Sequence, residues 1–450
     1  MRARHERLPF DSALYRDLFC DRDTAKLFTD SAEIRAMLLV EGALAKAQGG
    51  LGIIPAEAGN AIHRAALEAQ IDPGALAGAT GENGVSVPAL VTAFRAEIGD
   101  PEAAHYVHWG TTSQDIIDTA LILRLRQALL RIETGISKFC NLLAEHSQVH
   151  AQTPMAGRTY GQHATPTSFG AVTANWGQPF LTHLDRLEGL RPRLLTVSLS
   201  GAAGTGAALG PDLPELTRAL ADALGLQTGP APWHSKRDQI AELASWLTLV
   251  TGSCGKLGED LLRLTQTEIA EIDLGAAGAS STMPQKQNPV GPSVLVALAH
   301  HTAALNGAMQ GAMLHPHQRD GAAWFTEWLS LPAMIMGAAK AVHLAADLAE
   351  TMLPNPDRMA ANMEGRLGLI HAEALSFALA TKMPRPDAQR KIKEFCAEAQ
   401  AKGTPLPVLF AAAFPEIDTH AATASLGQAP EIARAFALAV TAQAAAKTSA

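Results

Sequence analysis

Apolar positions recur along the central chain at alternating steps of three and four residues. This spacing places the apolar side chains on one face of an α-helix. The clearest case predicts one helix from Ser235 to about Asp273, roughly 60 Å long at ~1.5 Å per residue. A seam of this length favours long packed helices, and we expect helices of several subunits to bundle along it. The seam positions are Ile240, Leu243, Leu247, Val250, Cys254, Leu257, Leu261 and Leu264.

Two earlier helices follow the same pattern. One is predicted to begin at Asp30, which can cap it with Glu33 three residues on, and to end at Gly49-Gly50. The other begins after a run of hydroxyl residues and reaches about Val149. Its apolar stripe is Leu125, Leu129, Ile132, Ile136, Phe139 and Leu143.

The remaining pattern is also helical. We expect a helix from Val290 to about Met313, another that reaches Leu353, and a helix after residue 166 that is bent or interrupted near Pro179. No strand run is long enough to predict a sheet. The sequence therefore predicts an all-α fold of three helical domains, at residues 1–105, 106–353 and 354–450.

Composition narrows the class of protein. The 450 residues are 47% apolar but only 5% aromatic, which is typical of helices packed through small side chains. A net charge of −8 without a basic tract argues against a nucleic-acid binder. No apolar run approaches the ~20 residues of a membrane span and no signal core follows the N-terminus, so we expect a cytoplasmic protein. Widely spaced cysteines predict buried thiols: Cys20, Cys140, Cys254 and Cys396.

One loop departs from the helical pattern. Residues 279–289 read Ala-Ser-Ser-Thr-Met-Pro-Gln-Lys-Gln-Asn-Pro and follow a glycine-rich stretch. The two prolines fix the exit of the loop, while the hydroxyl pair, the ammonium and the amide can contact a substrate. This arrangement is typical of a lid that brings a proton-transfer group and an anion clamp to a substrate. The alternative is an ordinary linker between helices.

This segment resembles the signature loop of the fumarase/aspartase superfamily, Gly-Ser-Ser-x-Met-Pro-x-Lys-x-Asn-Pro, with Ala279 in place of the first glycine. The resemblance extends over nearly the whole chain and is densest from residue 105 to 330. It implies a homotetramer with a central five-helix bundle and active sites built by three chains. It also implies reversible β-elimination through an aci-carboxylate, without a metal or cofactor.

A second region lies at His108–Asp115, which reads His-Trp-Gly-Thr-Thr-Ser-Gln-Asp. Its hydroxyls can cap the helix that follows, and together with the first-turn amides they can bind an anion. The region resembles the first signature region of the superfamily. The resemblance implies that Thr112 and Ser113 hold a substrate carboxylate. His108 and Asp115 match the form of this region in adenylosuccinate lyase-like members.

Residues 157–166 resemble the second signature region. Most members place an acid–base histidine after the threonine, whereas this chain has Tyr160 there and His163 three residues later. This replacement resembles the bacterial 3-carboxy-cis,cis-muconate cycloisomerases. It tells against fumarase, argininosuccinate lyase and adenylosuccinate lyase. The segment Pro232–Asp238, with a Trp-His pair before Lys-Arg, resembles the same group.

The resemblance also implies roles for loop residues. Ser281 would carry the proton at the reacting carbon, and Lys286 and Asn288 would bind the carboxylate that becomes the aci form. Ser280 would contact substrate beside them. Gln285 and Gln287 stand where His and Arg are common in related enzymes.

Further residues complete the predicted site. His163 and His108 would orient substrate or relay a proton, and the alternative for each is a structural histidine. A tricarboxylate on an acidic protein needs local cations, so Arg237 and Arg319 are candidates beside Lys286. Arg319 lies in a polar turn that resembles a substrate-binding segment of the superfamily. The His-x-His pair of this turn lacks an acidic or cysteine partner at ligand spacing, so we predict no metal there.

The leading hypothesis is therefore a cycloisomerase of aromatic-acid breakdown by the protocatechuate (β-ketoadipate) route. It would close 3-carboxy-cis,cis-muconate to a γ-lactone. The nearest alternative is an adenylosuccinate lyase-like enzyme that releases fumarate. An inactive, crystallin-like scaffold is the alternative from a different class, and the intact loop residues argue against it.

Overall fold

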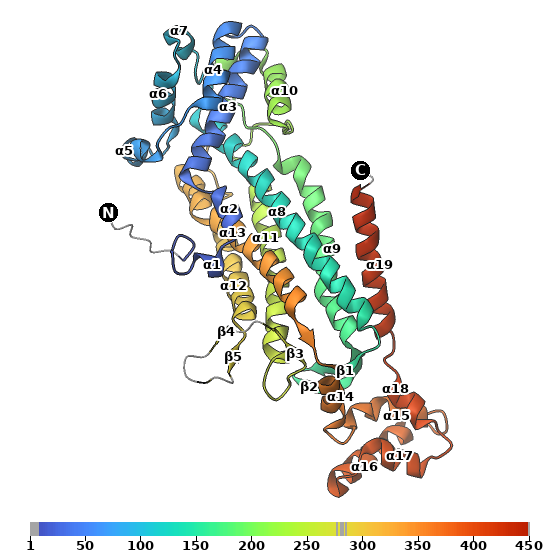
Figure 1. Cartoon of the computed structure of the whole chain (residues 1–450). Coiled ribbons are helices and arrows are strands. Elements are labelled where there is room, and N and C mark those ends of the chain that lie inside the picture. The colour runs from blue at the N-terminus through green and yellow to red at the C-terminus, as the bar shows by residue number, and fades with distance from the viewer. Residues whose placement is uncertain (1–8, 276–277, 280–282, 284–285, 449–450) are drawn as a thin grey trace. The chain divides into compact units, whose positions relative to one another are not determined.

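The structure is a computed structural model that describes residues 9–275, 278–279, 283 and 286–448. Helices dominate it, which confirms the predicted all-α fold (Figure 1). The described chain forms two compact units. Unit 1 holds the residues up to Gly135, His183–Gly252 and Ala297–His343, and unit 2 holds Ile136–Thr182, Ser253–Val296 and the residues from Leu344 onward. The three predicted domains are not tested by this division and stay a prediction.

In the part of the chain that the structure describes, five long helices carry the apolar seams. All eight predicted seam positions from Ile240 to Leu264 are buried, as are the six stripe positions from Leu125 to Leu143. Because the chain itself covers the seam, this seam gives no argument for bundling between subunits. The five helices are α8 (Ser113–Val149), α9 (Phe169–Leu194), α11 (Asp238–Leu264), α12 (Val290–Gly311) and α13 (Gly321–Thr351).

The helix predicted from Ser235 to Asp273 is shorter than expected, because α11 begins at Asp238 and ends at Leu264. After its end, the backbone N–H of Glu271 bonds back to the carbonyl of Leu264 at 2.9 Å. The next residues, Ile272–Asp273, form β3 and pair with Leu353–Pro354 (β6). Turns at residues 265–269 and the extended pairing of Ile272–Asp273 therefore replace the last helical turns of the prediction.

Unit 1 begins with short helices around the pair α3 and α4, which lie side by side in Figure 1. Small residues allow this close approach, since a Cβ on Gly42 would lie 2.5 Å from that of Ala66. The N-cap of α3 is Thr29, whose hydroxyl accepts from Ala32 N, and Asp30 is the first helical residue. The elements are α1 (Arg16–Phe19), α2 (Arg22–Lys26), α3 (Asp30–Gly50), α4 (Ala56–Glu68), α5 (Pro73–Asn83), α6 (Val87–Glu97), α7 (Pro101–Ala104), the 3-10 helix η1 (Ala207–Leu209) and α10 (Leu213–Leu224).

Unit 2 contains a feature that the sequence pattern did not predict, a β-hairpin of Pro154–Thr159 (β1) and Gln162–Ser168 (β2). The expectation of no sheet-forming run was wrong here, because these strands carry Thr, Gly and Gln instead of alternating apolar residues. The other elements are α14 (Pro356–Glu364), the 3-10 helix η2 (Leu369–His371), α15 (Ala372–Leu379), α16 (Arg385–Lys402), α17 (Leu406–Ala413), α18 (Thr419–Ala424) and α19 (Ala429–Thr448).

Proline does not interrupt α9. The helix continues through Pro179, so the expected interruption at that residue does not occur. Pro332 likewise lies inside α13. A proline removes one backbone hydrogen bond, and the packing of a long buried helix can offset that loss.

By length and composition alone, α13 could cross a membrane, which the sequence did not lead us to expect. However, 61% of its apolar window is buried inside the protein. This is what the core helix of a soluble protein shows, and the helix is explained by packing.

His183 on α9 is a buried histidine of unit 1, only 2% exposed. Trp246 on α11 donates its indole N–H to the backbone carbonyl of His183 at 2.9 Å. Burial, together with the charge of Arg186, lowers the pKa of His183 from 6.5 to about 4. The folded chain therefore holds this ring neutral at pH values where the unfolded chain protonates it.

We expect this ring to make the protein less stable in mild acid. As the pH falls from 6.5 toward 4, the unfolded chain gains a proton that the folded chain does not bind. The free energy of unfolding should therefore fall by an amount on the order of 3 kcal/mol. A His183→Gln variant should lose this part of the pH dependence. Urea unfolding at pH 7, 6 and 5 measures the effect. The control His420→Gln, at an exposed position of α18, should behave like the parent. If the free energy of unfolding changes equally with pH in all three proteins, His183 is not the source of the effect.

Candidate active site

The N-terminus of α8 lies in unit 1 and carries the hydroxyls that the sequence singled out. Thr112 directly precedes the helix and Ser113 is its first residue, so the first-turn amides have no acceptor within the helix. The chain enters through Gly110, which has a φ of 73° and where a Cβ would lie 2.7 Å from the carbonyl oxygen of Ala208. Glycine is needed for both reasons. The result is a helix terminus that can bind an anion.

The buried carboxylate of Asp115 stabilises this terminus through several hydrogen bonds. Its side chain is fully buried and accepts the backbone N–H of Thr112 at 3.1 Å, as the acidic member of a capping box does. It also accepts the backbone N–H groups of Ser200 at 2.8 Å and Gly201 at 2.9 Å. His234 Nε2 lies 2.8 Å from the same carboxylate. One carboxylate therefore fixes three separate loop segments around the start of α8.

Arg319 reaches the same place from the turn before α13. Its Nε donates to Gln114 Oε1 at 2.8 Å, and its Nη2 donates to Thr112 Oγ1 at 3.3 Å and to the carbonyl of Ala202 at 3.2 Å. The structure thus brings together two predicted substrate-binding residues, Thr112 and Arg319. Arg319 is exposed, and among the described residues its Nη1 has no hydrogen-bond partner. A guanidinium edge beside a helix N-terminus is suited to bind a carboxylate.

Arg237, predicted to recruit the substrate, has a different environment. It is 2% exposed and lies between two buried carboxylates. Its Nη1 donates to Asp118 at 2.6 Å and its Nε donates to Glu327 at 2.8 Å. Although burial opposes it, the charges of these two carboxylates raise the pKa of Arg237. Because its donors are already satisfied, Arg237 organises the interior, and we correct the prediction that it contacts substrate.

His108 is paired with a residue that the site prediction missed. Its Nδ1 lies 2.6 Å from Oε1 of Glu41 on α3, and Glu41 is only 2% exposed. His108 has a positive φ of 65°, a strained conformation for a non-glycine residue. Gln48, also on α3, donates to the carbonyl of Trp109 at 2.9 Å. The signal for Glu41 was present in the sequence, since a carboxylate occupies a position of the apolar stripe of its helix.

Tyr160 lies in unit 2 at the tip of the β-hairpin. Tyr160 and Gly161 form the two-residue turn, and their φ angles of 51° and 71° are both positive, as a type I′ turn requires. The tyrosine side chain is fully exposed, at 104% of its reference area. A bulky residue in this conformation and position is strained and has no packing role. Both features are consistent with the predicted contact to a substrate.

His163 pairs with Arg158 across the same hairpin. Burial lowers the pKa of His163, and the charges of Arg158 and Arg366 lower it further against the opposing charge of Glu271, which favours the neutral form of the ring. Its Nδ1 is buried without a hydrogen-bond partner among the described residues, unlike that of a satisfied structural histidine. Fully buried Glu271 anchors the hairpin, because it pairs with Arg158 at 2.6 Å and accepts from Asn362 at 2.8 Å.

The signature loop is described only in part. Its base is closed by pairing of Gly278–Ala279 (β4) with Gln287–Asn288 (β5). Asn288 is half-buried in that pairing, and Lys286 beside it is exposed. Ser280 and Ser281 lie outside the described residues. The predicted roles of these four residues stay predictions.

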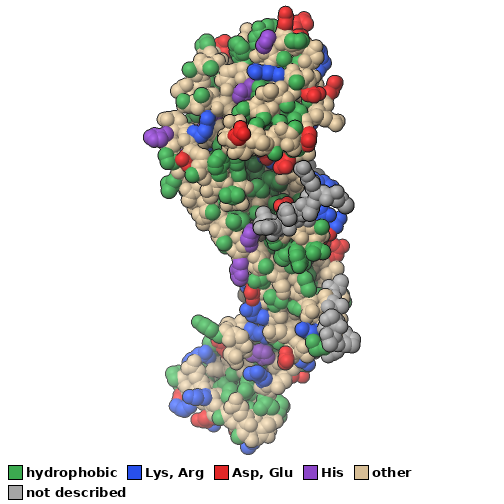
Figure 2. All heavy atoms as spheres, turned by 90° about the vertical axis from the view of Figure 1, so that its left-hand side faces the viewer, with side chains coloured by type: hydrophobic (Ala, Val, Ile, Leu, Met, Phe, Trp, Pro, Cys, Tyr) green, Lys and Arg blue, Asp and Glu red, His purple; other side chains and the backbone are tan. Residues whose placement is uncertain are grey.

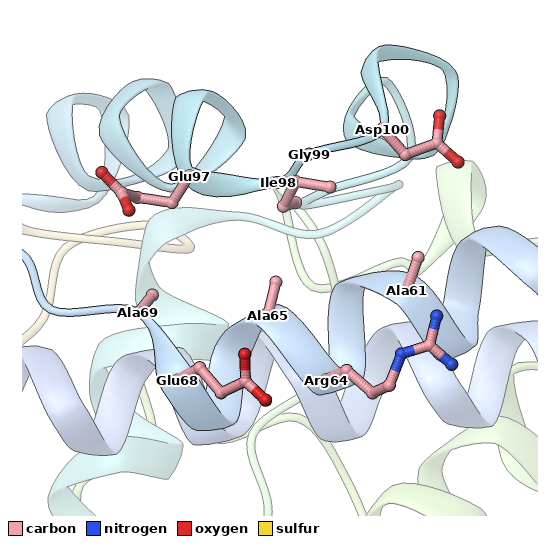
Figure 3. A pocket seen from close by; sticks show the side chains of 9 residues that line it. All are labelled: Ala61, Arg64, Ala65, Glu68, Ala69, Glu97, Ile98, Gly99 and Asp100. Carbon is pink, nitrogen blue, oxygen red and sulfur yellow. The ribbon is translucent and has the colours of Figure 1, made fainter.

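A pocket of about 400 Å³ lies elsewhere in unit 1, between α4 and the end of α6 (Figure 3). Arg64 is its single cation, against the carboxylates of Glu68, Glu97 and Asp100. Such a lining repels a polyanion, and none of the predicted site residues contributes to it. Within the described ranges, no three His, Cys, Asp or Glu side chains form a group that could hold a metal. The prediction that the protein needs no metal or cofactor is untested by this finding.

The long-helix fold and a helix terminus that is suited to bind a carboxylate are both consistent with an enzyme of the lyase type. The chain belongs to the lyase family, whose model matches residues 14–302, well over half of the sequence. This membership confirms the resemblance to the fumarase/aspartase superfamily.

Several relatives share most of the chain. The 3-carboxy-cis,cis-muconate cycloisomerase of Pseudomonas aeruginosa is 41% identical over 83% of this chain and 82% of its own. The nitrosuccinate lyase of Streptomyces davaonensis is 34% identical over 92% of this chain and 90% of its own. The crystal structure of 3-carboxy-cis,cis-muconate lactonizing enzyme from Pseudomonas putida matches with a TM-score of 0.90 at 36% identity, covering 96% of this chain and 99% of that chain.

We expect Asp115→Asn to destabilise the protein by about 2–4 kcal/mol. The amide nitrogen of Asn replaces one acceptor by a donor, so a buried backbone N–H of Thr112, Ser200 or Gly201 loses its partner. Urea unfolding followed by circular dichroism measures the loss. Asp222→Asn on α10, at an exposed position, is the matched control and should change stability by less than about 0.5 kcal/mol. Equal stabilities for the two variants would show that Asp115 does not organise this terminus.

Proposed function

We propose that this protein converts 3-carboxy-cis,cis-muconate into the γ-lactone 4-carboxymuconolactone. The observation that carries the proposal is its similarity to cycloisomerases, at 39–41% identity over 83–87% of the chain. The exposed guanidinium edge of Arg319 beside Thr112 supports it, because the substrate has three carboxylates to bind. Tyr160 in place of the usual histidine supports the same branch of the superfamily.

The reaction needs few protein groups. One substrate carboxylate oxygen attacks a carbon of the conjugated diene and closes the ring. The displaced electron pair moves toward a second carboxylate and forms an aci-carboxylate. A proton then adds to the carbon α to that carboxylate, and the trianion becomes a dianion. Each lactone formed therefore takes up one proton from the medium, which the enzyme must deliver to a carbon atom.

The residues divide into two roles. In unit 1, Thr112, Ser113 and Arg319 bind a substrate carboxylate, and His108 is held by buried Glu41 to orient substrate or relay a proton. Ser281 of the signature loop delivers the proton to carbon. The developing aci-carboxylate is bound by Lys286 and Asn288, with Ser280, Tyr160 and His163 completing the contacts.

We also propose that the enzyme is a cytoplasmic homotetramer with sites shared between subunits. Exposed apolar side chains support subunit contact: on α13, Leu329 is 82% exposed, Phe325 39% and Trp328 36%. Figure 2 shows hydrophobic side chains gathered in groups on one face of the molecule. The buried thiols of Cys20 and Cys254 fit a reducing compartment.

The decisive experiment mixes the purified protein with 3-carboxy-cis,cis-muconate and follows the loss of diene absorbance together with proton uptake. We expect rapid loss and one proton consumed per lactone. Ser281→Ala should reduce kcat by about 10²–10⁴-fold, because the proton donor to carbon is removed. Ser425→Ala, at an exposed position after α18, is the matched control and should keep full activity.

Two outcomes would contradict the proposal. If the parent leaves the diene unchanged but releases fumarate from an N- or S-(2-succino) compound, the protein is a lyase of the same family. If Ser281→Ala is as active as the parent, the loop serine does not transfer the proton.

Tyr160→Asn separates strain from function at the hairpin tip. Asn adopts positive φ more readily than Tyr, so the free energy of unfolding should stay equal or rise by up to about 1 kcal/mol. If Tyr160 contacts substrate, kcat/KM should nevertheless fall by about tenfold. Chemical unfolding and steady-state kinetics measure the two effects. Tyr15→Asn, at a position with ordinary backbone geometry, is the control, and an unchanged kcat/KM in both variants would exclude the contact.

A further inference from the structure

Gln114 is a buried amide at the second position of α8, and its side chain contacts three different groups. Its Nε2 donates to Asp118 Oδ2 at 3.1 Å and to the main-chain carbonyl of His234 at 2.9 Å. Its Oε1 accepts from Arg319 Nε at 2.8 Å. The side chain is 0% exposed, although the arginine it holds is an exposed residue. It therefore connects the interior of unit 1 to a group that can meet a ligand.

The interior fixes the orientation of this amide. Asp118 is itself held by Arg237, which also binds Glu327, and all three side chains are at most 2% exposed. If the amide were reversed, its oxygen would face the carboxylate of Asp118 and the carbonyl of His234. Its NH₂ group would then face the donating Nε of Arg319. Because only one orientation satisfies all partners, the carbonyl oxygen always points toward the arginine.

This contact determines which edge of Arg319 is available. Nε is engaged by Gln114, and Nη2 is engaged by Thr112 Oγ1 and by the carbonyl of Ala202. Among the described residues, Nη1 is left without a partner. Because the Thr112 hydroxyl accepts from Arg319, its own proton remains available as a donor. Nη1 and the Thr112 hydroxyl are thus two donors at this helix terminus that a ligand carboxylate could use.

We propose that Gln114 is a positioning residue that sets the pose of Arg319, and through it the affinity for a substrate carboxylate. The inference rests on the proposed function and names a residue that acts without touching the substrate. Arg319 is a long side chain with considerable rotamer freedom, which the bond to Gln114 removes before the ligand arrives. The buried charge triad is the rigid support on which this bond depends.

The test is a double-mutant cycle of Gln114→Leu and Arg319→Ala, with kcat and KM measured for 3-carboxy-cis,cis-muconate. We expect Gln114→Leu to raise KM about tenfold while kcat changes less than about threefold, since one bond to a charged group is lost. Arg319→Ala should raise KM more. The double variant should match Arg319→Ala alone, because Gln114 acts only through the arginine. Additive effects, or an equal fall in kcat and kcat/KM, would overturn the proposal.

Gln310→Leu is the matched control. Gln310 is a partly buried glutamine of unit 1 whose Nε2 donates to Ser245 Oγ at 3.0 Å and to the carbonyl of Ala241 at 3.2 Å, without an arginine partner. This variant should keep the KM and kcat of the parent. Gln114→Met, which is closer to glutamine in shape, is made alongside Gln114→Leu. If neither Gln114 variant folds, the residue is structural and the proposal fails.

Binding of tricarballylate, a saturated tricarboxylate, separates this inference from the proposed function. Isothermal titration should give a Kd that rises about tenfold in Gln114→Leu and shows the same non-additivity with Arg319→Ala. If the parent does not turn over the muconate but the cycle holds for tricarballylate, the function is wrong and the positioning role stands. If the parent turns over the muconate and neither KM nor Kd responds to Gln114→Leu, the positioning role is wrong. A parent that binds neither ligand overturns both.

Discussion

Two buried carboxylates, one turn apart on α8, determine how the candidate site residues of unit 1 are positioned. Asp115 and Asp118 are both fully buried, and a buried ionised carboxylate is costly unless it is paired and hydrogen-bonded. Asp115 is satisfied by backbone N–H groups and His234, which draws three loop segments to the helix terminus. Asp118 is satisfied by Arg237 and Gln114. The geometry that could bind a substrate follows from these requirements.

Unit 2 also contains a buried carboxylate that must be paired and hydrogen-bonded. Fully buried Glu271 is paired with Arg158 of β1 and with Asn362 of α14. This anchors the hairpin whose exposed tip carries Tyr160, and it places a cation across from His163. In both units a buried carboxylate paired with an arginine supports an exposed side chain of the candidate site. Removing one partner of such a pair is expected to cost far more than removing an exposed ion pair.

The sequence was sufficient for features that depend on local pattern. The apolar seams, the hydroxyls before α8 and the family motifs are all read from neighbouring positions. The sequence did not predict the buried environment of Arg237, because its partners Asp118 and Glu327 are 119 and 90 residues away. A charged residue has the same appearance in a sequence whether its side chain is buried or exposed. The hairpin was missed because its strands lack alternating apolar residues, and Gly161 at the turn was the only local signal.

The reassignment of Arg237 changes how an acidic protein with net charge −8 can attract a trianion. The carboxylates of Asp118 and Glu327 surround this guanidinium, so the three side chains together carry at most one net negative charge. Burial raises the pKa of Glu327, although the charge of Arg237 opposes this shift. The three side chains add no attraction for an anion. In the described part of unit 1, Arg319 and the first-turn amides are groups at the α8 terminus that can attract an anion. One guanidinium edge backed by buried acids suits a single carboxylate, so the other two charges of the proposed substrate need cations outside this cluster, and Lys286 of the signature loop is a candidate.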